Sequence, residues 1–197
     1  GDCDVAIGAG AENMSRAPYA SLATRFGARM GDAKMVDMLV GALHDPFHTI
    51  HMGVTAENIA AKWGISREDQ DQLAAESHRR AQAATEAGYF KDQIVPVISK
   101  GRKGEVVFDT DEHFRSNCTV EDMAKLKPVF LKENGTVTAG NASGINDAAA
   151  ALVLMEAGTA KARGLAPMAR LVAYAHAGVD PKYMGIGPVP ATQLALK

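Results

Sequence analysis

The residues from Ser66 to Gly88 carry the strongest local signal in the chain, that of one long helix. Ser66 followed by Asp69 matches a capping box, in which the two side chains satisfy each other's backbone N–H groups. Gly88 supplies the stop, because glycine readily takes the left-handed conformation that ends helices. The small and apolar residues expected on the packed face are Leu73, Ser77, Ala81 and Ala84. This helix therefore needs a core, or a sheet, against which one face can pack.

Short apolar runs on both sides of this helix predict strands. Residues 4–12 indicate a buried strand that ends in a tight turn. Residues 94–99 and 105–109 predict a hairpin around a basic tip at residues 100–104. That tip either contacts a phosphate or is a solvated turn. Residues 170–175 predict a further buried strand.

The apolar run at residues 148–155 is open to two interpretations. Its alanine content favours a helix, whereas its length also suits a buried central strand. Elsewhere Thr55 is expected to cap a helix that ends near Gly64. Stop and start signals predict three more helices, at residues 121–126, at residues 156–163 and from Pro188 and Pro190 onward.

The composition limits the classes of partner. The chain has 47% apolar and 22% charged residues, as a globular protein does. Its net charge of -2 contains no dense basic block, so we expect no nucleic-acid partner. Its apolar runs are too short to span a membrane, so we expect no membrane partner. The two cysteines, Cys3 and Cys118, form no disulfide framework and favour a reducing compartment, the cytoplasm.

Three histidines, at positions 44, 48 and 51, suggest a metal hypothesis. On one helix their spacing would place all three rings on the same face. Pro46 argues against an unbroken helix there, and no pattern of supporting groups is visible. We therefore expect no metal site.

No complete catalytic set is present. Residues 8–13 resemble a dinucleotide loop, but Asn13 stands where that loop needs its third glycine. Neither cysteine lies at a glycine-rich helix start that would lower its thiol pKa. Ser143 lacks the strand-to-helix elbow of a hydrolase. We expect no catalytic residue in this chain.

Residues 137–147 (VTAGNASGIND) combine small and polar side chains. Such a run lets a ligand approach the backbone closely, and Ser143 offers a hydroxyl for a hydrogen bond. The same run also suits a structural turn packed beneath a strand. The residues alone leave these two interpretations equal.

The run nevertheless resembles the stretch of thiolases that lines the pantetheine arm of coenzyme A. Three further segments, at 10–15, 51–58 and 184–190, agree with thiolase motifs in order and spacing, and four more are also similar, so that the resemblance covers essentially the whole chain. They are GAENMS at 10–15, RMGD at 29–32, HMGVTAEN at 51–58, KDQIVP at 91–96, KGRKG at 100–104, GVDP at 178–181 and MGIGPVP at 184–190. The likeness is greatest to bacterial acetyl-CoA acetyltransferases and β-ketothiolases.

The resemblance implies the α/β class and the thiolase-like layered αβαβα fold, divided here into four parts. Residues 1–14 would finish the N-terminal half. Residues 15–135 would form an α+β loop domain that covers coenzyme A and carries a tetramerisation loop at residues 16–37. Residues 136–165 would be the last strand and helix of the N-terminal half, and residues 166–197 would begin the C-terminal half. Residues 148–155 would then be a strand.

By the same resemblance nine residues would contact the coenzyme or its acyl group. Ser143 would hydrogen-bond the pantetheine, His51 would lie beside it, and Arg115 would reach the nucleotide end. Met52 and Met184 would line the acyl pocket. The cleft would be shaped by Leu43, Phe130, Ala139 and Ile145.

The implied function is that of an acyl-CoA C-acyltransferase, which condenses two acyl-CoA molecules or cleaves a 3-ketoacyl-CoA by thiolysis. The family's catalytic Cys/His/Cys groups would lie outside this segment, which alone should be inactive. Coenzyme A or acyl-CoA would be a substrate, with no tightly bound cofactor. A homo-oligomer, as a dimer of dimers, is implied. The alternative is a coenzyme A or acyl-binding module without chemistry.

Overall fold

A computed structural model of the chain describes residues 3–102 and 104–197. The chain divides into two compact units, and each is described by itself. The split unit comprises Gly1–Thr55 and Ile145–Lys197, and the continuous unit is Ala56–Gly144. Helices and strands occur in both units, which confirms the α/β class. The four-part division of the domains is not tested by these units and stays a prediction.

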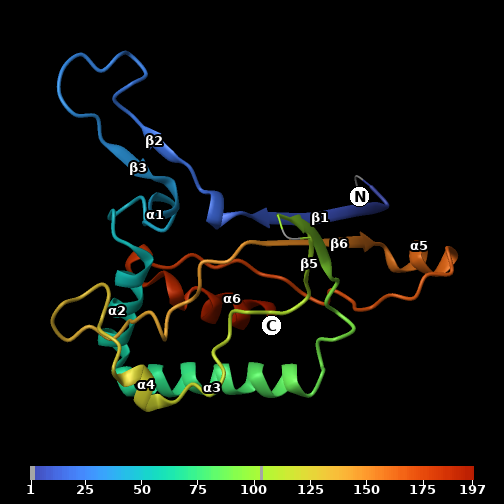
Figure 1. Cartoon of the computed structure of the whole chain (residues 1–197). Coiled ribbons are helices and arrows are strands. Elements are labelled where there is room, and N and C mark those ends of the chain that lie inside the picture. The colour runs from blue at the N-terminus through green and yellow to red at the C-terminus, as the bar shows by residue number, and fades with distance from the viewer. Residues whose placement is uncertain (1–2, 103) are drawn as a thin grey trace. The chain divides into compact units, whose positions relative to one another are not determined.

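The main sheet of the split unit consists of β1 (Val5–Glu12) and β6 (Ala148–Met155), which pair antiparallel with Val5 opposite Met155 (Figure 1). This pairing settles the ambiguity at residues 148–155, because the backbone of β1 completes the ladder that a strand requires. The expectation that the first strand is buried is wrong for the described residues. Ile7 on β1 is 72% exposed, in a sheet that has only the strands β1 and β6 among the described residues.

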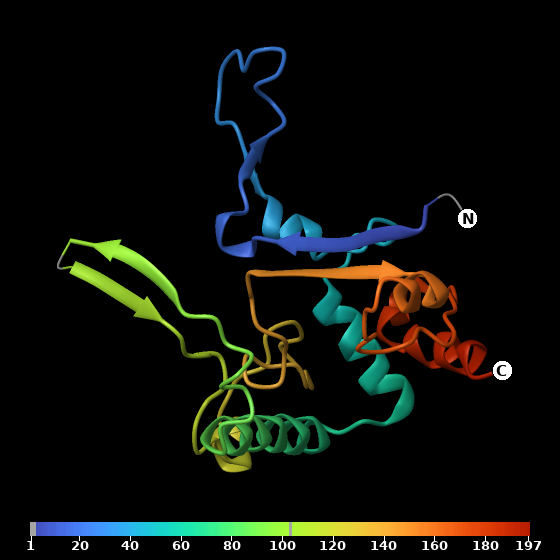
Figure 2. The same ribbon diagram turned by 90° about the vertical axis from the view of Figure 1, so that its right-hand side faces the viewer.

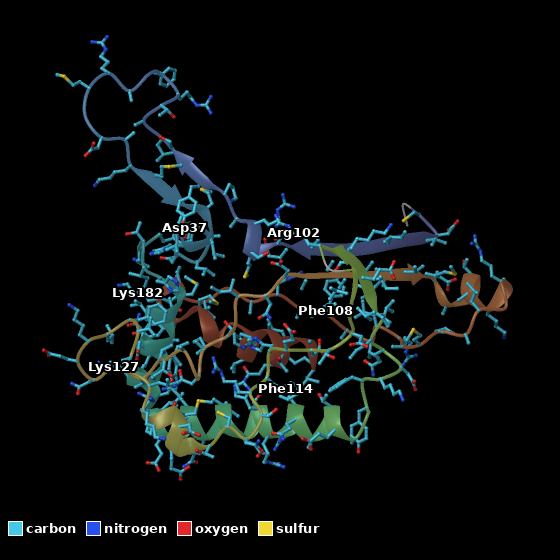
Figure 3. The ribbon with its side chains drawn as sticks, viewed as in Figure 1. Asp37, Arg102, Phe108, Phe114, Lys127 and Lys182 are labelled. Carbon is cyan, nitrogen blue, oxygen red and sulfur yellow. The ribbon has the colours of Figure 1, made fainter. Side chains whose placement is uncertain are left out.

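The rest of the split unit consists of short elements. Asp37 begins α1 as its N-cap, and its Oδ1 accepts a hydrogen bond of 2.9 Å from the backbone N–H of Leu39 (Figure 3). The helices predicted at residues 156–163 and after Pro188 are confirmed. The elements are η1 (Met14–Arg16), β2 (Tyr19–Ser21), β3 (Met35–Asp37), α1 (Met38–Ala42), α5 (Ala157–Ala162), η2 (Pro181–Ile186) and α6 (Pro188–Ala195).

The strand predicted at residues 170–175 is wrong. These residues belong to no strand, and Leu171, Val172 and Tyr174 are exposed. A strand needs a neighbour with which to form its hydrogen-bond ladder, and none of the described segments pairs with this run. An apolar run of this length is therefore not sufficient to predict a strand.

Helix α2 (Met52–Trp63) begins in the split unit and continues into the continuous unit. The prediction that Thr55 caps it is wrong, because Thr55 lies buried inside the helix. Its hydroxyl donates to the carbonyl of Met52 at 2.6 Å. The helix starts earlier because the carbonyl of His51 already accepts the N–H of Val54 at 2.8 Å, which closes a first turn.

Helix α3 (Arg67–Glu86) begins with the predicted capping box. The Ser66 hydroxyl accepts the Asp69 N–H at 3.0 Å, and the Asp69 carboxylate accepts the Ser66 N–H at 3.0 Å. The packed face was predicted wrongly, since Leu73 is 73% exposed whereas Asp71 and Ala75 are buried. The buried face is instead a polar stripe that binds later segments of the same unit.

The remaining elements of the continuous unit agree with the sequence. The predicted hairpin forms between β4 (Val97–Gly101) and β5 (Gly104–Phe108), with Val97 opposite Phe108 (Figure 2). Residue 103 of its basic tip lies outside the described residues. Helix α4 (Val120–Ala124) confirms the helix predicted at residues 121–126, and Thr119 caps it. Among the described residues, no helix is both long and apolar enough to cross a membrane.

Candidate functional site

The nine predicted contact residues fall into both units. The split unit holds Leu43, His51, Met52, Ile145 and Met184. The continuous unit holds Arg115, Phe130, Ala139 and Ser143. Each group is described within its own unit.

The loop at residues 136–144, called the small-residue loop below, is held by a buried carboxylate. Glu57 on α2 is only 4% exposed. Its oxygens accept the N–H of Thr136 at 2.9 Å, the hydroxyl of Thr136 at 2.7 Å and the N–H of Val137 at 2.9 Å. A buried carboxylate is tolerated when donors surround it in this way. These bonds fix the start of the loop against α2.

Asn141 fixes the middle of the same loop. Its amide Nδ2 donates to the carbonyl of Thr136 and to Asp71 Oδ1, each at 2.9 Å. Its Oδ1 accepts the N–H of Thr138 at 2.7 Å. The side chain thus closes a turn from within, while Ala139 and Ser143 stay exposed. The loop is rigidly held on one side and open to a ligand on the other.

A glycine allows the small-residue loop to lie directly on the α4 segment. A Cβ at Gly140 would overlap the side chains of Met123 and Leu126. Met123 is itself 2% exposed, so it has little room to move. The backbone carbonyl of Val137 also accepts the N–H of Val129 at 3.0 Å, next to half-buried Phe130. Close backbone approach explains why this loop is rich in small residues.

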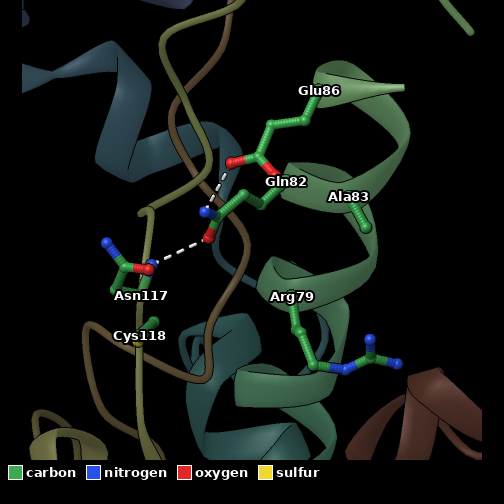
Figure 4. A pocket seen from close by; sticks show the side chains of 6 residues that line it. All are labelled: Arg79, Gln82, Ala83, Glu86, Asn117 and Cys118. Atoms are coloured by element: carbon green, nitrogen blue, oxygen red, sulfur yellow. Dashed lines mark hydrogen bonds between the residues drawn. The ribbon is translucent and has the colours of Figure 1, made fainter. Parts of the chain in front are cut away.

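The segment around Arg115 is attached to α3 through its backbone. The N–H of Arg115 donates to His78 Nδ1 at 3.1 Å, and the N–H of Asn117 donates to Gln82 Oε1 at 2.8 Å (Figure 4). The Arg115 side chain is left exposed. A hollow of about 260 Å³ lies beside this attachment, lined by Arg79, Gln82, Ala83, Glu86, Asn117 and Cys118. A second hollow of about 340 Å³ shares Arg79 and Cys118 with it.

His78 is suited to accept that hydrogen bond. Partial burial lowers the pKa of His78, and the nearby positive charges of His113 and Arg115 lower it further. A neutral imidazole keeps a lone pair available at one nitrogen. The electrostatics therefore favour the state in which His78 holds the Arg115 backbone.

Within the split unit, His51 contacts a second histidine. The rings of His44 and His51 meet edge to face with centroids 5.2 Å apart. Burial lowers the pKa of His51, and the charge of His44 adds to the effect. The N–H of Met52 donates to the carbonyl of Leu43 at 2.8 Å, which joins three predicted contact residues on one short stretch. Ile145 and Met184 are exposed.

The three histidines do not assemble into a metal site. Throughout the described part of the chain, no group of three His, Cys, Asp or Glu side chains is placed to hold a metal ion. His48 is instead held through its backbone, where its N–H donates to buried Asp45 at 2.6 Å.

The residues that hold the small-residue loop were missed in the sequence. Glu57, Asp71 and Asn141 are common polar residues in ordinary helical or loop contexts. The local contacts are the i,i+4 ion pair of Arg67 and Asp71 and the bonds of Asn141 with Thr136 and Thr138, five and three positions away. The remaining partners of Glu57, Asp71 and Arg67 lie 56 to 80 positions away, beyond any local pattern.

Comparisons with known proteins place the chain among thiolases. A family model described as the thiolase N-terminal domain matches residues 1–158. The beta-ketothiolase BktB of Cupriavidus necator is 73% identical over 197 residues, and an acetyl-CoA acetyltransferase of Pseudomonas aeruginosa is 56% identical over 198. Both alignments cover all of this chain and 50% of the relative, so the chain spans about half the length of these relatives.

Solved structures give the same result. The acetyl-CoA acetyltransferase of Bacillus anthracis superposes with a TM-score of 0.91 at 51% identity, covering 98% of this chain and 49% of the other. Human mitochondrial 3-ketoacyl-CoA thiolase in complex with CoA superposes with a TM-score of 0.88 at 44% identity, covering 98% and 48%. The predicted thiolase-like α/β fold is confirmed.

Proposed function

The chain belongs to the thiolase family, and we propose that it supplies the coenzyme A-binding part of an acyl-CoA C-acyltransferase. The reaction proposed for the whole protein is the condensation of two acyl-CoA molecules, or thiolysis of a 3-ketoacyl-CoA. In this proposal coenzyme A is a substrate and not a resident cofactor. The residues of this chain bind and orient it.

The observation that carries the proposal is the small-residue loop. Glu57 and Asn141 hold it by hydrogen bonds of 2.7 to 2.9 Å, so a ligand would meet a preformed surface. Ala139 allows the ligand close to the backbone, and the exposed hydroxyl of Ser143 can hydrogen-bond an amide of the pantetheine. The exposed guanidinium of Arg115 suits a phosphate at the nucleotide end. The roles of the other predicted residues are proposals of the same kind.

Calorimetry with coenzyme A would test this on the protein at the full length that its gene encodes. We expect saturable binding, weakened by about tenfold in Ser143→Ala, as the loss of one ligand hydrogen bond predicts. Arg115→Gln should weaken binding of coenzyme A but not of pantetheine. Absence of saturable binding would contradict the proposal. Binding without thiolysis of acetoacetyl-CoA would favour the alternative, a binding module without chemistry.

We also propose that the protein is a homo-oligomer, a dimer of dimers. The loop between β2 and β3 supports this, because it exposes apolar side chains that include Phe26 at 96% and Met30 at 99%. Light scattering would give the mass in solution. Phe26→Ser combined with Met30→Ser should halve a tetramer, whereas Thr24→Ala in the same loop should not. An unchanged mass in the double variant would reject this loop as the contact.

A further inference from the structure

The buried ion pair of Arg67 and Asp71 lies between two segments of the continuous unit. One segment is the end of α4 with Leu126 just after it, and the other is the small-residue loop. Arg67 Nε donates to Asp71 Oδ2 at 2.7 Å, and the Asp71 side chain is 2% exposed. Each partner of the pair then reaches a different segment.

Arg67 binds the end of α4. Its Nη2 donates to the carbonyls of Met123 at 2.7 Å and Leu126 at 3.0 Å. Carbonyls at the end of a helix lack partners inside the helix and carry its negative partial charge. The guanidinium therefore adds a charged donor to the Met123 carbonyl, which already accepts the Leu126 N–H at 3.0 Å, and also binds the Leu126 carbonyl just after the helix.

Asp71 binds the small-residue loop. Its Oδ1 accepts the amide of Asn141 at 2.9 Å, while its Oδ2 is occupied by Arg67. The two oxygens of this buried carboxylate are thus satisfied by its own helix and by the loop. Displacement of the loop would leave Oδ1 unpaired.

The same face of α3 holds the segment around Arg115, which is predicted to bind the nucleotide end of coenzyme A. Positions 67, 71, 78 and 82 follow spacings of four, seven and four, which form one helical stripe. His78 and Gln82 bind the backbone of Arg115 and Asn117. One rigid helix face therefore sets the positions of Arg115, α4 and the loop that carries Ser143.

We propose that Asp71 is a positioning residue for coenzyme binding. It couples the segment predicted to bind the nucleotide end of coenzyme A to the loop predicted to bind the pantetheine arm. The inference rests on the proposed function and adds residues that touch no ligand. It predicts that loss of Asp71 weakens binding of both the nucleotide end and the pantetheine end of coenzyme A. Loss of Asn141 should affect the pantetheine end alone, because the ion pair and its contacts with α4 remain.

Thiolysis of acetoacetyl-CoA by the full-length protein would test the coupling with two thiols, coenzyme A and pantetheine, which lacks the nucleotide. Asn141→Ala should raise KM for both thiols by the same factor. Asp71→Asn should raise KM for coenzyme A by about tenfold and by a larger factor than for pantetheine, with kcat per folded molecule within about twofold. Glu68→Gln, an exposed carboxylate on the same helix, should change neither KM.

The outcomes separate this inference from the proposed function. A wild-type protein that neither binds nor uses coenzyme A would overturn the proposed function. A wild-type protein that uses coenzyme A, with equal KM changes for both thiols in Asp71→Asn, would overturn the inference alone. If Asp71→Asn does not fold, Arg67→Lys takes its place. Lysine cannot span the carboxylate and two carbonyls as a guanidinium does, so the same unequal change is expected, and an equal change would again overturn the inference.

Discussion

Glu57 and Thr136 lie 79 residues apart in the sequence, yet the carboxylate of one accepts both the N–H and the hydroxyl of the other. Glu57→Gln would replace one acceptor oxygen by an NH₂ group that faces these donors. We expect the free energy of unfolding to fall by about 2–4 kcal/mol, because the variant loses the carboxylate charge and leaves a buried donor without an acceptor.

Chemical denaturation would measure this change. The control is Glu68→Gln, which removes an exposed carboxylate and should lie within about 0.5 kcal/mol of the wild type. Equal effects of the two variants would show that the hydrogen bonds of Glu57 do not stabilise the loop.

Three glycines allow a graded test of close packing. A Cβ at Gly135 would overlap the backbone carbonyl of Leu131 and lie 2.7 Å from Pro128 Cβ. Because backbone cannot rotate away, Gly135→Ala should cost more than about 3 kcal/mol of unfolding free energy. Gly140→Ala meets side chains instead and should cost about 1–3 kcal/mol. Gly178→Ala meets nothing within 4 Å and should be neutral or slightly stabilising. Thermal unfolding would rank them, and a reversed order would contradict the packing described.

The lowered pKa of His78 predicts how the folding stability depends on pH. Burial, with His113 and Arg115, holds the folded-state pKa below 6.5. The unfolded chain therefore binds this proton more readily, so the contribution to stability is complete above pH 6.5 and is lost as pH falls below it. Proton NMR titration should show the low pKa. His113→Gln should raise it, whereas replacement of the exposed His176 by Gln should leave it unchanged. A His78 pKa above 6.5 would contradict the burial found here.

The lowered pKa of Asp147 gives a pH dependence of the same sign, in a lower pH range. Its carboxylate accepts the N–H of Ser15 at 2.9 Å and its hydroxyl at 2.5 Å, and these bonds lower the pKa of Asp147. The stabilisation is complete above the unfolded value of 3.8 and is lost as pH falls through the folded pKa. Ser15→Ala should raise the pKa of Asp147 in a carboxyl NMR titration. Thr110→Ala, another exposed hydroxyl, should leave that pKa where it is.

Local signals predicted many elements correctly because they act over three or four residues. Ser66 and Asp69 interact through neighbouring atoms of one helix turn, so their pattern is visible in the sequence. Gly88 ends α3 at a positive φ of 75° for an equally local reason. Where a choice needed a distant partner, the local pattern failed. Residues 148–155 and 170–175 are both apolar runs, and within the described part of the chain only the first has a strand with which to pair.

The sequence by itself determined the α/β class, most helix limits and, through its motifs, the thiolase resemblance. It also indicated residues 137–147 as either a binding loop or a turn, and the choice between the two stays a prediction. Only the tertiary structure decided which face of α3 is buried and which carboxylates hold the loop. Hydrophobic periodicity marks apolar faces, whereas Glu57 and Asp71 are buried because donors from residues 136–141 surround them. Those donors lie close to the two carboxylates only when the chain has folded.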